Sequence, residues 1–251
     1  MAVDERVRSA MENWAPRFVA NGVDLNDFQR VTQRIERWDD WCHEWSACAA
    51  MHAHLGEDAE AQRCYTSAAQ HYFHAAMAYH FGKFLFVQRP EELRAAHEQT
   101  VRSYQRALPY LDYPGERVAI PYAEGEVMYG ILRKPWHTPR PPVIILIPGL
   151  DSVKEELHAY GDDFLRRGMA TLAMWACSAS ALAGTTPRVQ QRSSRASKPR
   201  LHSPDSIALW TVSTVSLRLH ERPSSFASKL LMRRSRVPSW SDSICAACWR
   251  D

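Results

Sequence analysis

The sequence lacks the features of several protein classes. None of its apolar runs reaches the roughly 18–20 residues that a membrane span needs. The start Met1-Ala2-Val3-Asp4-Glu5-Arg6 has no apolar stretch behind a basic segment, so no signal peptide is predicted. Six cysteines in 251 residues are too few for a disulfide scaffold. These absences exclude a membrane protein, a small secreted domain and a collagen-like chain, and we expect a cytoplasmic protein of one large or two smaller domains.

Glycine and acidic residues are scarce in the last third of the chain. Residues 175–251 contain one glycine, four Asp/Glu, 12 Lys/Arg and 16 serines. Residues 1–174 contain nine glycines, 24 Asp/Glu, 19 Lys/Arg and five serines. Two regimes of composition therefore meet near Trp175, and the two parts need separate interpretations.

Residues 4–111 have the apolar spacing of helices throughout. The stripes comprise Phe28, Val31, Ile35 and Trp38; Trp38, Trp41, Trp45, Cys48, His52 and Leu55; Ala61, Tyr65, Ala68, Tyr72, Ala75 and Tyr79; and Leu93, Ala96, Thr100, Tyr104 and Ala107. We expect Asp24 or Asn26 to cap the first of these helices, Gly56 to end the second and Pro90 to begin the last. The connections are short, which favours antiparallel neighbours. An all-helical domain is therefore predicted over residues 1–111.

The period of the pattern changes after residue 111. Alternating apolar residues over 118–122 and 127–131 predict a β-hairpin. The aliphatic run 143–147 predicts a strand buried on both faces, followed by a helix over 155–167, a cap at Gly168 and a strand over 169–174. This hairpin and one βαβ unit make residues 112–174 a truncated α/β sheet, so the fold class is α/β with an N-terminal helical cap.

Residues 175–251 do not continue this sheet. Residues 183–205 have no apolar periodicity, and only the run 207–213 is strand-like. A composition rich in Ser, Arg, Pro and Cys, with almost no Gly, is typical of an out-of-frame reading of a GC-rich gene. We expect residues 175–251 to be a largely frameshifted, poorly structured or disordered tail, with a genuine divergent segment as the alternative.

Residues 1–174 resemble α/β-hydrolases with an N-terminal helical cap, the family that includes 2,6-dihydroxypseudooxynicotine hydrolase and relatives of the fermentation–respiration switch protein. The segment Trp38–Leu55, the hairpin Val118–Pro135 and the run from Ile145 to Leu157, Ile-Leu-Ile-Pro-Gly-Leu-Asp-Ser-Val-Lys-Glu-Glu-Leu, carry the resemblance. It implies ester or C–C bond hydrolysis by a Ser–Asp–His triad beneath a cap. It also implies an oxyanion hole formed by the backbone N–H of Leu150, after the first parallel strand, and of the residue after the nucleophile.

The triad itself is not recognisable in these residues. Ser213 follows the strand-like run at about the place of a nucleophile elbow, which would make Thr214 the second oxyanion residue. Both glycines of the Gly-x-Ser-x-Gly pattern are replaced by β-branched residues, however, which resist positive φ. The alternative is that Ser213 is one of 16 serines in a biased tail. The only histidine after it, His220, precedes Asp242, whereas the family order is Ser, Asp, His.

Other residue patterns are weaker signals. Histidines 43, 52, 54, 71 and 74 allow a metal site, but no HExxH motif or paired CxxC spacing is present, and cap-lining side chains are the better interpretation. No metal and no cofactor are predicted. The CxxC spacing of Cys245 and Cys248 is interpreted as accidental. The basic tail would attract nucleic acid, but its charges form no helical face, so nucleic acid is not an expected partner.

The sequence therefore predicts a hydrolase of the α/β class with a small aromatic substrate, inactive in this form because the triad is incomplete. The prediction of an aromatic substrate rests on the many Trp, Tyr, Phe and His residues of the cap. The alternative is a helical module that binds an aromatic ligand without catalysis. No membrane partner is predicted, and the helical domain could form a homo-oligomer.

Overall fold

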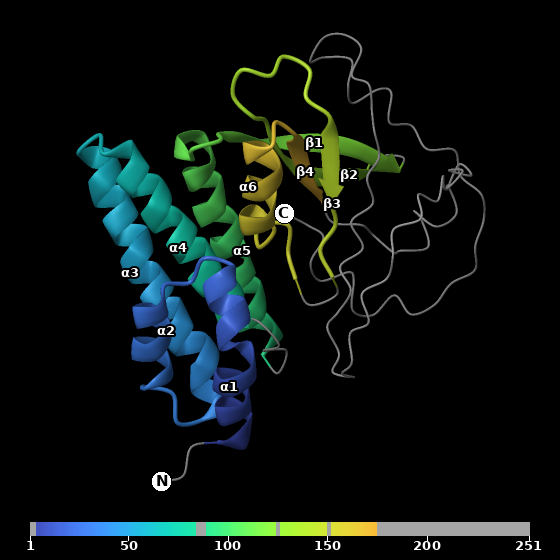
Figure 1. Ribbon diagram of the computed structural model, residues 1–251. Coiled ribbons are helices and arrows are strands. Elements are labelled where there is room, and N and C mark those ends of the chain that lie inside the picture. Colours follow the sequence, from blue (N-terminus) through green and yellow to red (C-terminus); the bar gives the residue numbers. More distant parts are fainter. Residues whose placement is uncertain (1–3, 84–88, 124–125, 150–151, 175–251) are drawn as a thin grey trace, which may run out of the picture.

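The computed structural model describes residues 4–83, 89–123, 126–149 and 152–174 (Figure 1). Its helices are α1 (Glu5–Ala20), α2 (Leu25–Thr32), α3 (Trp41–Ala61), α4 (Tyr65–Lys83), α5 (Pro90–Ala107) and α6 (His158–Arg166), with 3₁₀ turns at Trp38–Asp40 and Leu108–Tyr110. Its strands are β1 (Gly115–Ala123), β2 (Glu126–Arg133), β3 (Val143–Leu146) and β4 (Ala170–Met174). The predicted order of a helical region followed by a small sheet is confirmed. Every helix in the described ranges is too short or too polar to cross a membrane.

The helices begin where the capping residues predict. The Asp24 carboxylate accepts hydrogen bonds from the backbone N–H groups of Asn26 and Asp27 at the start of α2. Pro90 is the first residue of α5, where its missing N–H leaves no broken helical bond. Helices α3, α4 and α5 lie side by side and form most of the helical region (Figure 1).

The prediction that Gly56 ends a helix is wrong, because α3 continues through it to Ala61. The chain instead turns at Arg63, whose φ is 60°, with Cys64 N–H donating to the Ala59 carbonyl over 2.8 Å. Gly56 serves packing: a Cβ there would lie 2.6 Å from the ring of Tyr72 on α4. The absence of a side chain lets α3 and α4 approach each other, so Gly56 marks a close contact between helices and not the end of one.

The helix predicted over 155–167 begins three residues later. Glu156, Leu157 and His158 donate their N–H groups to the carbonyl three residues earlier, so the chain forms tight turns before α6 starts at His158. The predicted cap at Gly168 is confirmed. Its φ is 80°, and Met169 N–H donates to the Phe164 carbonyl over 3.0 Å.

The strands form one mixed sheet in the order β1-β2-β4-β3. Strands β1 and β2 are the predicted hairpin, with Val118 opposite Gly130. Strand β4 pairs in parallel with β3 and antiparallel with β2, so it lies between them. The βαβ unit therefore extends the hairpin, and the turn after β3 emerges at the end of the sheet that faces the helices (Figure 1).

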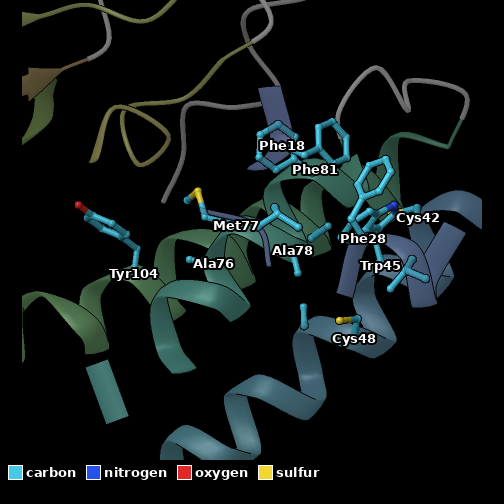
Figure 2. Close-up of a cluster of buried hydrophobic side chains, with 14 of the residues drawn as sticks. Phe18, Phe28, Cys42, Trp45, Cys48, Ala76, Met77, Ala78, Phe81 and Tyr104 are labelled. Carbon is cyan, nitrogen blue, oxygen red and sulfur yellow. The ribbon is translucent and has the colours of Figure 1, made fainter. Parts of the chain in front are cut away.

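The main hydrophobic core lies among the helices and reaches the sheet. Phe18, Phe28, Trp45 and Phe81 pack there ring against ring, with Phe18 and Phe81 stacked at 3.9 Å between centroids (Figure 2). The same core cluster joins side chains of the helices to side chains of the sheet and of the turn before α6, namely Trp41, Met77, Tyr104, Ile131, Ile144, Leu146, Leu157 and Ala173. The aromatic stripe predicted to line a cap pocket is therefore in large part a packed core.

Candidate functional site

The turn that follows β3 is the candidate site, because it carries the segment that the family resemblance assigns to an oxyanion hole. Gly149 lies at its exposed start, and Ser152 N–H donates to the Gly149 carbonyl over 3.3 Å. From Ser152 onward the chain is buried: Ser152 is 2% exposed, and Glu155 and Glu156 are each 1% exposed. Because these three polar side chains are buried, they need hydrogen-bond or ion-pair partners inside the protein.

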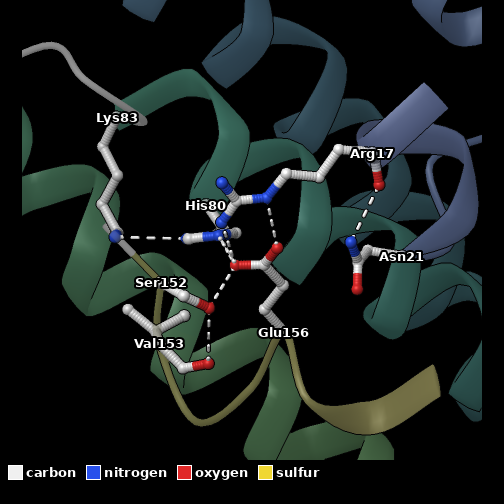
Figure 3. A network of polar contacts seen from close by, with 7 residues as sticks. All are labelled: Arg17, Asn21, His80, Lys83, Ser152, Val153 and Glu156. Atoms are coloured by element: carbon white, nitrogen blue, oxygen red, sulfur yellow. Dashed lines mark hydrogen bonds and ion pairs between the residues drawn. The ribbon is translucent and has the colours of Figure 1, made fainter. Parts of the chain in front are cut away.

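Glu156 joins the turn to two helices (Figure 3), whereas Glu155 pairs with its neighbour Lys154 at 2.9 Å. Its carboxylate accepts two hydrogen bonds from Arg17 on α1, at 2.8 and 3.0 Å, and one from His80 Nε2 on α4, at 2.9 Å. The Ser152 hydroxyl donates to the same carboxylate from within the turn. Figure 3 shows these groups converging on Glu156 from three elements, so one buried carboxylate connects the turn to the helical region.

The protonation states in this network follow from the geometry. Lys83 Nζ lies 3.3 Å from His80 Nδ1, and since an ammonium only donates, His80 accepts at Nδ1 and donates from Nε2 to Glu156. Burial lowers the pKa of His80, and the Lys83 charge lowers it further, which favours the neutral ring. Burial opposes ionisation of Glu156, but the hydrogen bonds from His80 and Arg17 outweigh it and lower the pKa of Glu156 to about 2.

A second buried group joins the start of α6 to the neighbouring elements. The Tyr104 hydroxyl on α5 lies 2.9 Å from His158 Nδ1, and Arg133 on β2 forms an ion pair with Asp162 at 2.7 Å. Burial lowers the pKa of His158 well below its usual value, and the Arg133 charge acts in the same direction. The Nδ1 atom of a neutral His158 can accept a hydrogen bond from the Tyr104 hydroxyl, so neither partner of this bond is charged.

The residues predicted to supply the nucleophile and the oxyanion hole are not among those that the structure describes. Leu150, Ser213 and Thr214 all lie outside the described residues, as do Cys245 and Cys248. The nucleophile and oxyanion assignments therefore stay predictions.

The predicted histidine cluster divides into two sets. His52 and His71 approach to 3.2 Å between their Nδ1 atoms, and His74 meets the His52 ring edge-on at 5.2 Å between centroids. His43 and His54 are exposed, and His54 faces Glu57 and Asp58 of its own helix at 3.9 and 3.8 Å. Two partners were not predicted: Asp27, whose Oδ2 is 2.7 Å from His52 Nε2, and Cys48, one turn before His52 on α3. The i, i+4 spacing of Cys48 and His52 is the sequence signal that indicates the pair.

Sequence reasoning also missed Arg17, His80 and Glu156 as a unit. Arg17 and Glu156 are 139 positions apart, and His80 and Glu156 are 76 apart, so no local pattern links them. One signal was available: the charged run Lys154-Glu155-Glu156 comes after the loop 148–153, which follows a strand predicted to be buried on both faces. Charges at such a place need buried partners.

A family model described as "Esterase FrsA-like" matches residues 28–195, which is well over half of the chain. The chain belongs to this family. The curated relatives include 2,6-dihydropseudooxynicotine hydrolase of Paenarthrobacter nicotinovorans, 29% identical over 68% of this chain and 46% of the relative. Another is the alpha/beta hydrolase pydG of an Acremonium species, 25% identical over 62% of this chain and 38% of the relative.

A solved structure supports the same FrsA-like membership. The crystal structure of 2,6-dihydroxy-pseudo-oxynicotine hydrolase superposes with a TM-score of 0.57 at 30% identity, covering 64% of this chain and 45% of that one. The chain thus spans less than half the length of the relatives it matches. The resemblance predicted from the helical segment, the hairpin and the turn after β3 is confirmed, and the hydrolase class of the family with it.

Proposed function

We propose that residues 1–174 form the helical cap and the oxyanion turn of an α/β-hydrolase that cleaves an ester or C–C bond of a small aromatic substrate. The observation that carries the proposal is the buried carboxylate of Glu156, which holds the turn after β3 against α1 and α4. A cap can exclude water from a hydrolytic site only if its position relative to the oxyanion donors is fixed. The names of the relatives, which include a hydrolase of a pseudooxynicotine, favour an aromatic or heteroaromatic substrate.

The chemistry assigned to the turn is stabilisation of a developing oxyanion. In a Ser–Asp–His mechanism, negative charge forms on the substrate oxygen when the serine attacks, and backbone N–H groups near Gly149 and Leu150 would donate to it. Preorganised donors are effective because they need no reorganisation during the reaction. The network around Glu156 would supply that preorganisation, acting through the turn rather than on the substrate.

We further propose that these 251 residues do not turn over esters by themselves, because no residues after Ser213 follow the order Asp, then His. The test is p-nitrophenyl acetate hydrolysis by the purified chain beside Ser213→Ala. We expect the two rates to be equal and no faster than that of the boiled protein. Turnover that disappears in Ser213→Ala would overturn this part of the proposal.

The hydrolase assignment itself is tested in the gene. The other two reading frames downstream of codon 174 should encode a strand followed by Gly-x-Ser-x-Gly, then an Asp and a His in that order. Their absence from both frames would remove the frameshift account of residues 175–251. It would also leave the family's reaction without a nucleophile in this gene.

A second candidate function is binding of an aromatic ligand without catalysis. A pocket of about 380 Å³ between α1 and the start of α3 is lined by Trp14, Trp38 and Trp41, with the Arg6 guanidinium 5.8 Å from the centre of the Trp38 ring. Glu5 also lines the pocket and Arg6 pairs with Asp4, so the aromatic walls are suited to a small neutral aromatic ligand. Calorimetric titration with phenol is expected to give saturable heat that Trp14→Ala abolishes; equal heat in both proteins would exclude this pocket.

A further inference from the structure

Three side chains with metal-binding chemistry converge in the helical region, in a place to which the hydrolase proposal assigns no role. A carboxylate oxygen of Asp27 on α2, the Sγ atom of Cys48 and an imidazole nitrogen of His52 on α3 all lie within 4.8 Å of one another. Cys48 and His52 are four residues apart and so share one face of α3. The exposed fractions are 8% for Cys48, 9% for the His52 side chain and 12% for that of Asp27. One sulfur, one nitrogen and one oxygen donor are thus gathered in a nearly dry place.

The ring nitrogen of His52 that would not bind the metal, Nδ1, already has a partner in His71. His52 Nε2 faces Asp27 at 2.7 Å, while His52 Nδ1 faces His71 Nδ1 at 3.2 Å. Metal-binding histidines usually donate the N–H of the other ring nitrogen to an acceptor, which fixes the tautomer and the ring plane. With Nε2 turned to a metal, the Nδ1–H of His52 would donate to a neutral His71. The arrangement of the two rings therefore matches a ligand and its supporting acceptor.

The charges of Arg30 and Arg34 both act on this site, and Arg30 is the one that pairs with a proposed ligand. The Arg30 guanidinium forms an ion pair with Asp27, and its side chain is 48% exposed. Half-exposed arginine pairs are weak, because solvent screens the charges and holding the long side chain costs entropy. Arg30 thus shows that the carboxylate attracts a cation at this point, and it can swing into solvent when a metal ion takes its place.

We propose that Asp27, Cys48 and His52 bind a divalent cation of the zinc class, with His71 orienting His52 and water completing the coordination. A set of one thiolate, one imidazole and one carboxylate is suited to Zn²⁺ and Co²⁺, whereas Mg²⁺ and Ca²⁺ prefer oxygen ligands alone. Binding releases the thiol proton of Cys48 to solvent. The bound ion would link α2 to α3. This site is independent of the proposed hydrolase activity.

The test is a Co²⁺ titration of the reduced, metal-free full chain carrying Cys245→Ser and Cys248→Ser. These two substitutions remove the CxxC pair, which could itself bind the metal. We expect about one Co²⁺ per chain, the visible bands of tetrahedral Co²⁺ and a near-ultraviolet thiolate-to-cobalt charge-transfer band. Cys48→Ser should remove the charge-transfer band. The matched control is Cys42→Ser, because Cys42 is the other buried cysteine of α3, and it should leave the band unchanged.

Two further variants separate ligation from a folding defect. His71→Gln should weaken Co²⁺ binding about tenfold, the lower end of the effect of losing a supporting partner. Arg30→Gln should strengthen binding about two- to fivefold by removing the competing cation, a gain that a misfolded protein does not produce. The proposal is overturned if the parent chain shows no charge-transfer band, if the band survives Cys48→Ser, or if Arg30→Gln does not tighten binding.

Discussion

Replacing Glu156 by Gln tests whether the buried carboxylate holds the turn after β3 against the helices. The substitution keeps the shape of the side chain but removes the negative charge of the carboxylate to which Arg17 and His80 donate hydrogen bonds. The amide also brings an N–H₂ group toward donors, where only an acceptor can be satisfied. Because Arg17 is 17% exposed and Glu156 is 1% exposed, water cannot fully replace the lost partner.

The expected loss is about 3 kcal/mol of unfolding free energy at pH 7. Lowering the pKa of Glu156 from 4.5 to about 2 corresponds to about 3 kcal/mol in favour of the ionised carboxylate, at 1.36 kcal/mol for each tenfold step. Removing one partner of a buried ion pair costs about 3–5 kcal/mol in other proteins. The two routes agree on a loss several times larger than that of an exposed pair.

The assay is urea unfolding of the two proteins at pH 7 and pH 3. The folded pKa lies below the unfolded one, so the contribution of Glu156 is complete above about pH 4.5 and is lost as the pH falls toward 2. The gap between the wild type and Glu156→Gln should therefore shrink to about half at pH 3. Asp163→Asn, which breaks an exposed pair with Arg166, is the control and should cost less than about 0.5 kcal/mol. The reasoning is refuted if Glu156→Gln matches this control at pH 7, or if its deficit is the same at both pH values.

Three other substitutions test the packing. Gly56→Ala is expected to cost about 1–3 kcal/mol because the new Cβ would lie 2.6 Å from the Tyr72 ring; a gain in thermal stability would contradict this. At Gly161, in α6, an added Cβ would lie no closer than 3.5 Å to any neighbour. Gly161→Ala is therefore expected to be neutral or to stabilise the protein by up to about 1 kcal/mol in the same melts. Tyr104→Phe should cost about 1–3 kcal/mol in urea by leaving the buried Nδ1 of His158 without its partner, and an unchanged midpoint would argue against that bond.

Periodicity predicted the elements well because it reports local burial. The hairpin, the strand at 143–147, the cap at Gly168 and the helix that begins at Pro90 are all where the pattern indicates. Each of these signals lies within a few residues of the structure it specifies. The error at Gly56 has the same origin: a glycine ends a helix or permits a close approach, and the choice depends on Tyr72, sixteen positions away on another helix.

The polar groups of the candidate site could not be predicted in the same way. Arg17, His80 and Glu156 meet only after α1, α4 and the turn after β3 have packed together, and the sequence contains no period that relates them. The same holds for Asp27 beside His52, which lie on different helices. What sequence reasoning can recognise is the anomaly, a charged run after an aliphatic strand, but not the partners that resolve it.

The core also bears on whether the helical region is stable alone. The predicted boundary at residue 111 separates it from the sheet, but Ile131, Ile144 and Leu157 belong to the same core cluster as Phe18 and Trp45. A chain ending near 111 would expose that apolar face and leave Arg17 and His80 without the carboxylate of Glu156. We therefore expect limited proteolysis to leave the sheet residues up to 174 in the same protected fragment as the helices. A resistant fragment ending near residue 111 would show instead that the helical region folds independently of its contacts with the sheet.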